Sequence, residues 1–118
     1  MEIRNAKIFD VSLTMKDHGM LTFDLNLIGG GWGVHYGGYC LGKGYLGATT
    51  FLGTDAGLEA IMRVMDVVGV DRWEDLKGKY IRAEVGPCGS RVTKIGNIVK
   101  DNWFDIKKFF ELRSQKDV

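Results

Sequence analysis

Hydrophobic and polar residues alternate along the first 27 positions in a way that predicts two antiparallel strands. Residues 3–15 are rich in β-branched and apolar side chains, and residues 21–27 alternate apolar with polar positions. We expect the odd-numbered apolar residues from Phe9 to Met15 to face inward, with a bulge or a bend near residue 8, where the phase of the pattern changes. The segment 16–19, Lys-Asp-His-Gly, predicts the turn that joins the two strands into a hairpin.

The spacing of apolar residues becomes helical after residue 54. Thr54 is a favourable N-cap, and Gly69 is a favourable C-terminal stop. We expect the apolar stripe between them to pack against the sheet; its members are Leu58, Ile61, Met62, Met65 and Val68. Asp105 predicts the cap of a last helix, one face of which carries Ile106, Phe109, Phe110 and Arg113.

The remaining segments predict shorter elements. Residues 32–41 indicate a glycine-rich strand, and residues 42–53 a loop. A short helical turn at 72–76, capped by Asp71, precedes two strands at 80–85 and 91–99. The order β-β-β-α-β-β-α is dominated by hairpins, so we expect one α+β domain over residues 1–118 with two main helices and a curled antiparallel sheet that approaches a barrel.

Composition narrows the class of protein. The chain has 118 residues, of which 45% are hydrophobic and 26% charged, and a net charge of +1, so it can form one core without disulfides. No apolar run is long enough to cross a membrane, and the N-terminus lacks a hydrophobic signal core, so we expect a cytoplasmic location. Two cysteines and two histidines favour a reduced compartment and predict neither a metal site nor a cofactor.

Candidate catalytic chemistry is sparse, and we nominate no catalytic residue. The acidic residues are scattered over predicted turns and caps rather than paired on apolar faces. The segment from Gly37 to Lys43 has the spacing of a phosphate-binding P-loop, but Gly44 stands where the motif needs Ser or Thr. The sequence therefore favours a binding protein over an enzyme.

Two features suit an anionic ligand with an aromatic ring. Residues 77–94 contain five basic residues and one acidic residue, a local net charge of +4. Trp103 and Phe104 closely follow Asn97, which places stacking rings near an amide that can read a base edge. The alternative is structural, with Trp103 packed between the last strand and the last helix.

Three segments together resemble one known family. They are Lys-Asp-His-Gly at 16–19, the stretch at 62–79 that begins Met-Arg-Val-Met-Asp, and Ile-Gly-Asn-Ile-Val-Lys-Asp-Asn-Trp-Phe at 95–104. This ordered set is similar to the Thoeris anti-defence protein 1 family of phages and prophages. The resemblance spans most of the chain.

The resemblance implies a non-enzymatic sponge that acts in the cytoplasm of an infected host cell. Such proteins sequester the cyclic ADP-ribose isomers made by bacterial TIR-domain defence proteins, and some also bind cyclic trinucleotides at a separate site. They bind in pockets between subunits, which implies a homo-oligomer, a dimer or a hexamer. The resemblance assigns Asn97 as a polar contact to the signal and Trp103 and Phe104 as stacking residues, and we assign Arg63 and Arg113 to the phosphates of the cyclic trinucleotide.

Two other classes of function remain open. A curled sheet with basic strands at 79–94 could bind single-stranded nucleic acid, although the net charge of +1 disfavours long nucleic acid as a partner. The amphipathic last helix could instead contact and inhibit a host enzyme.

Overall fold

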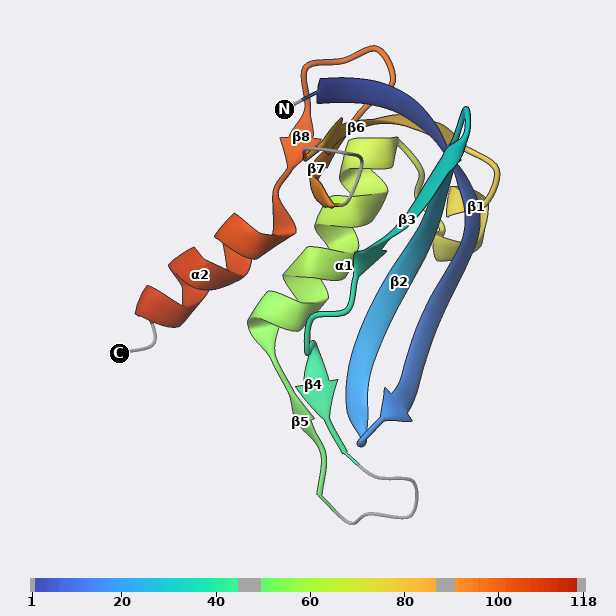
Figure 1. Cartoon of the computed structure of the whole chain (residues 1–118). Helices are drawn as coiled ribbons and strands as arrows, with labels where there is room; N and C mark the ends of the chain where they lie inside the picture. Colours follow the sequence, from blue (N-terminus) through green and yellow to red (C-terminus); the bar gives the residue numbers. More distant parts are fainter. Residues whose placement is uncertain (1, 45–49, 87–90, 117–118) are drawn as a thin grey trace.

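A computed structural model describes residues 2–44, 50–86 and 91–116 and confirms an α+β fold with a curled antiparallel sheet (Figure 1). The helix α1 lies against the concave side of this sheet, and α2 extends away from it. The elements are β1 (Glu2–Asp17), β2 (Met20–Gly29), β3 (Trp32–Gly37), β4 (Gly42–Lys43), β5 (Leu52–Gly53), α1 (Asp55–Val68), the 3-10 helix η1 (Trp73–Leu76), β6 (Tyr80–Val85), β7 (Val92–Gly96), β8 (Trp103–Phe104) and α2 (Ile106–Lys116).

The strands in the described residues form one half-barrel sheet in the order β5-β4-β2-β1-β6-β7-β8, with β3 paired to β2. All of these pairings are antiparallel. The open side of the half-barrel is crossed by Tyr36 on β3, whose hydroxyl donates to the carbonyl of Phe104 on β8 at 2.8 Å. The same hydroxyl accepts a hydrogen bond from the amide of Ile106 at 3.1 Å, so one side chain fixes β3 to the start of α2.

The hairpin of β1 and β2 is confirmed, and so is the bulge. His18 and Gly19 have φ angles of 52° and 76°, the left-handed pair that a tight two-residue turn requires. The register shifts between Ile8 and Asp10, which leaves Phe9 as the bulge residue. The inward orientation predicted for Phe9 is therefore wrong: its side chain is 57% exposed, while Ile8 before it is fully buried.

The apolar stripe predicts the buried face of α1 only in part: Ile61 and Val68 pack against the core, but the most buried positions are others. Small residues face the sheet, namely Gly57, Ala60, Val64 and Val67. Leu58 and Met62 point outward and are 64% and 56% exposed. The reason is close approach: a Cβ added to Gly57 would overlap the carbonyl oxygen of Leu41, so only a small face fits against this part of the chain.

Several predicted boundaries also change. β3 ends at Gly37 rather than at residue 41, because Gly37 and Gly38 both adopt positive φ angles, and the predicted loop at 42–53 contains the short strands β4 and β5. β7 ends at Gly96 rather than at residue 99. Asp71 is not the cap of η1, whose N-cap position is held by Arg72 without a side-chain hydrogen bond.

Both predicted caps of the main helices are confirmed. Thr54 accepts a hydrogen bond from the amide of Gly57 at 2.9 Å, and Asp105 accepts one from the amide of Lys108 at 3.0 Å. The predicted face of α2 packs inward: Ile106 is buried, and Phe109 and Phe110 are partly buried against the same core. Within the described residues, no helix combines the length and apolar character needed to cross a membrane.

Candidate functional site

The side chain of Asn97 links the end of α1 to the loop after β7 through hydrogen bonds. Its amide nitrogen donates to the carbonyls of Val67 and Val68 at 3.0 and 3.4 Å, at the C-terminal end of α1. Its amide oxygen accepts hydrogen bonds from the backbone of Val99 and Lys100 at 3.0 and 2.9 Å. The side chain thus satisfies orphan carbonyls of the helix and orders the following turn at once.

This geometry changes the interpretation of Asn97. The residue is only 9% exposed, and both ends of its amide already have protein partners. A ligand could hydrogen-bond to it only by displacing one of those partners. The surroundings of Asn97 therefore favour a structural role over the polar contact to a signal that the resemblance assigns to it.

Trp103 forms a cation–aromatic cluster on the outer face of the sheet. The indole covers Gly96, its partner on β7, so closely that a Cβ at Gly96 would stand about 2.5 Å from the ring. The guanidinium of Arg82 lies 4.7 Å from the ring centroid, and the ammonium of Lys94 lies 5.2 Å from it. Each cation can interact with the ring, which favours the arrangement by about 0.5–1 kcal/mol per pair at an exposed site.

Hydrogen bonds and ion pairs hold the two cations of this cluster in different ways. Arg82 donates to the carbonyls of Asn97 and Lys100, both at 2.7 Å, so its guanidinium is fixed to the loop. Lys94 pairs with Glu84 at 3.2 Å through a single flexible side chain. Lys94 is consequently the cation of this cluster that can turn toward a ligand at the smallest cost.

Phe104 lies in the core rather than on a binding surface. Its side chain is 5% exposed and packs edge-to-face against Phe109, with ring centroids 5.6 Å apart. In this position Phe104 offers a ligand almost no exposed ring surface for the stacking role that the resemblance assigns to it. The alternation of β8 explains the difference, since Trp103 and Phe104 are consecutive in a strand and point to opposite faces.

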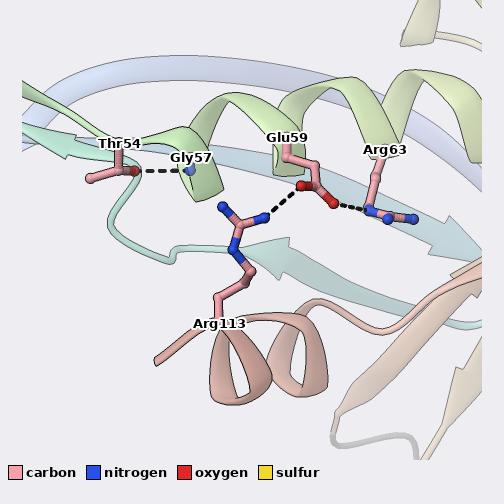
Figure 2. Close-up of polar contacts among 5 residues, drawn as sticks. All are labelled: Thr54, Gly57, Glu59, Arg63 and Arg113. Carbon is pink, nitrogen blue, oxygen red and sulfur yellow. Dashed lines mark hydrogen bonds and ion pairs between the residues drawn. The ribbon is translucent and has the colours of Figure 1, made fainter. Parts of the chain in front are cut away.

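Arg63 and Arg113 converge although they lie on different helices. Both pair with Glu59: the Nε of Arg63 at 2.7 Å and a terminal nitrogen of Arg113 at 2.6 Å (Figure 2). Both guanidiniums also lie beside the ring of Phe109, at 5.6 and 5.7 Å from its centroid. We call these four residues the arginine cluster.

The arginine cluster carries a net positive charge at neutral pH. The hydrogen bond from Arg63 lowers the pKa of the Glu59 carboxyl, Arg113 lowers it further, and partial desolvation opposes both, so Glu59 remains ionised. Two guanidiniums against one carboxylate leave one excess charge. A phosphate that reached this cluster could take donors from two arginines on two elements, the arrangement that favours bidentate recognition.

Sequence reasoning missed the residues that organise these clusters. Glu59 stands four positions before Arg63, a spacing that indicates an ion pair on a helix surface, but nothing in the sequence connects either residue to Arg113. Arg82 and Lys94 were visible only as members of the basic segment. Their convergence on Trp103 depends on the pairing of β6, β7 and β8.

Comparison with known protein families, with curated proteins and with solved structures found no match to this chain. Across residues 2–44, 50–86 and 91–116, no three His, Cys, Asp or Glu side chains gather closely enough to hold a metal ion. Cys40 is a free thiol in the structure, and Cys88 lies outside the described residues. The features of this chain that bear on function are therefore the two cation–aromatic clusters and the resemblance.

Proposed function

We propose that this protein binds and sequesters small cyclic nucleotide signals without cleaving them, so that it blocks a bacterial anti-phage defence from within the host cytoplasm. Cyclic ADP-ribose isomers are the primary ligands, and cyclic trinucleotides are the second class. The observation that carries the proposal is that cations converge on aromatic rings at two places, Trp103 and Phe109. Both ligand classes combine purine rings with phosphates, which such clusters can recognise.

The cluster at Trp103 suits the cyclic ADP-ribose isomer. Stacking a base on an aromatic ring contributes about 1–3 kcal/mol, and the nearby ammonium of Lys94 can approach the pyrophosphate. Nanomolar retention needs about 12 kcal/mol, so one such cluster is insufficient alone. A second subunit that encloses the ligand would supply further contacts and exclude water, which is why the proposal includes a homo-oligomer.

The release of intact ligand tests sequestration. The purified protein is incubated with a cyclic ADP-ribose isomer, freed of unbound ligand by gel filtration, and then heated to denature it. The expected result is that the unchanged signal is recovered from the supernatant. Recovery of a cleaved product would contradict the non-catalytic proposal, and the absence of any nucleotide would contradict binding.

Paired variants test the assignment of the two clusters. Arg113→Ala is expected to weaken a cyclic trinucleotide about 10- to 100-fold, since one charge-assisted phosphate contact is worth roughly 1.5–3 kcal/mol, and to leave the cyclic ADP-ribose isomer unaffected. Trp103→Leu is expected to do the reverse. Calorimetry measures all four combinations on variants whose thermal unfolding shows that they are folded.

Arg72→Ala is the matched control for the arginine variant, because Arg72 is exposed and pairs with Glu74, away from the arginine cluster. It should bind both ligands as the wild type does. Equal weakening of both ligands by Arg113→Ala and by Trp103→Leu would show one shared site and contradict the assignment.

The exposed apolar surface beside α1 predicts self-association. Phe51, Leu52, Leu58 and Met62 are each more than half exposed, and the first three line an apolar hollow of about 210 Å³. Monomeric proteins seldom expose such a group of large side chains together. We expect multi-angle light scattering to show at least a dimer at micromolar concentration, and Leu58→Lys with Met62→Lys to shift the protein toward a monomer.

Val99→Lys is the control for this prediction, because Val99 is 81% exposed but lies in the loop after β7. It should leave the oligomer intact. A wild-type protein that is monomeric at this concentration would refute the homo-oligomer.

A further inference from the structure

A groove of about 670 Å³ runs between β3, the start of β7 and the first turn of α2. It lies on the side of the half-barrel where β3 and β7 have no ladder between them, and Tyr36 lies along it. Its lining includes Tyr39, Arg91, Asp105 and Lys107, none of which belongs to the two clusters described above. The volume falls in the range of small-molecule sites, about 300–1,000 Å³.

The charges along the groove are unbalanced. Among the described residues, neither Arg91 nor Lys107 forms an ion pair. The carboxylate in the lining, Asp105, already accepts the hydrogen bond that caps α2. Among the lining residues, two full positive charges therefore face one carboxylate that already caps α2, while Glu111, which acts on Tyr39, lies outside the lining. The lining is thus suited to an anion.

An aromatic wall stands beside these cations. Tyr39 stacks on Phe110 of α2 with ring centroids 5.2 Å apart and only 9° between the ring planes. Burial raises the pKa of the Tyr39 phenol, and the carboxylates of Glu111 and Asp105 raise it further, while Arg91 acts in the opposite direction. Arg91 and Tyr39 line the same groove, so one ligand in it can contact both.

The groove is also held in shape before any ligand arrives. The Tyr36 hydroxyl bonds both the Phe104 carbonyl and the Ile106 amide, which fixes β3 to the end of β8 and to the first residue of α2. The Phe110 ring restrains Tyr39 from one face, so a planar base against the other face would extend an existing stack. The side chains of Tyr36 and Tyr39 therefore have little freedom left to lose on binding, and this favours affinity.

We propose that this groove binds a nucleoside mono- or diphosphate, with the terminal phosphate between Arg91 and Lys107 and the base against Tyr39. This goes beyond the proposed sequestration of cyclic signals, because the ligand is linear and the site is distinct from the Trp103 and arginine clusters. A terminal phosphate carries up to two negative charges, which matches the two cations better than the single charge on each phosphate of a cyclic nucleotide.

Calorimetry with ADP as the probe tests the inference on the full-length protein. We expect ADP to bind, and Arg91→Ala and Lys107→Ala each to weaken it about tenfold or more. Adenosine and inorganic phosphate should each bind at least tenfold more weakly than ADP, because each lacks half of the recognition. Lys108→Ala is the matched control, since Lys108 neighbours Lys107 on α2 but does not line the groove, and it should bind as the wild type does.

Three results would overturn the inference. The first is that ADP does not bind to the folded wild type. The second is that Arg91→Ala and Lys107→Ala both bind ADP as tightly as the wild type, and the third is that inorganic phosphate binds as tightly as ADP.

Competition with the cyclic ADP-ribose isomer separates this inference from the proposed function. We expect saturating ADP to leave the isomer bound. Displacement would contradict a separate groove, whereas an isomer that fails to bind while ADP binds would contradict only the proposed function.

Discussion

Replacing Asn97 with alanine is expected to lower the free energy of unfolding by about 2–4 kcal/mol. The substitution removes both halves of a nearly buried amide network. The carbonyls at the end of α1 lose their donor, and the amides of Val99 and Lys100 lose their acceptor. Urea denaturation followed by circular dichroism measures the change.

Two further variants test which hydrogen bonds account for the loss of stability. Asn97→Asp keeps an acceptor for the loop amides but sets a carboxylate against the helix carbonyls, so it should be at least as destabilising as alanine at neutral pH. Asn102, in the same loop as Asn97, donates an exposed hydrogen bond to Asp66 on α1, and Asn102→Ala should cost less than about 0.5 kcal/mol. If Asn97→Ala left the free energy of unfolding nearly unchanged, the hydrogen bonds of the Asn97 side chain would contribute little to stability.

Gly57→Ala is expected to destabilise the protein by about 2–3 kcal/mol, although the same change normally stabilises a helix by up to about 1 kcal/mol. The sign reverses because the new methyl group would overlap the backbone carbonyl of Leu41, which cannot move as a side-chain tip could. Thermal unfolding should show a lower melting temperature for this variant.

Gly53→Ala is the matched control for this prediction. A Cβ at Gly53 meets no heavy atom within 4 Å, and Gly53 does not have a positive φ angle. It should therefore change stability by less than about 0.5 kcal/mol. A Gly57→Ala protein as stable as the wild type would contradict the tight seating of α1 on Leu41.

The sequence predicted the extent of α1 well but its buried face only in part, for a physical reason. Helical periodicity and the Thr54 and Gly69 signals are local, so they can be read directly from the chain. Which face is buried depends on how closely the sheet approaches. At Gly57 the close neighbour is the backbone of Leu41, on a segment between β3 and β4 whose position no local pattern determines. Small residues therefore hold the most buried positions of α1, while Leu58 and Met62 point outward.

The candidate site shows the same division between local and long-range information. The resemblance assigns Asn97 to the site. The hydrogen bond from its side chain to Val67, 30 residues away, instead links the loop after β7 to the end of α1, and no local pattern predicts that contact. The arginine cluster could not be assembled from sequence, because Glu59 and Arg113 lie 54 positions apart on separate helices. The sequence also could not predict that Arg91 and Lys107 line one groove, since they come from different parts of the chain.

The pairing of β1 has a consequence for how the chain acquires this structure during synthesis. The hairpin with β2 can form as soon as residue 29 is available, but the first residues of β1 pair with β6, from Glu2 with Val85 to Lys7 with Tyr80. Residues 80–85 follow residue 29 by 51–56 positions, so at about 5–20 residues per second the start of β1 waits roughly 3–11 s for its partner after the hairpin can form. Charged side chains at Glu2, Arg4 and Lys7 interrupt the apolar character of the waiting edge, which is how natural strands resist pairing with other chains.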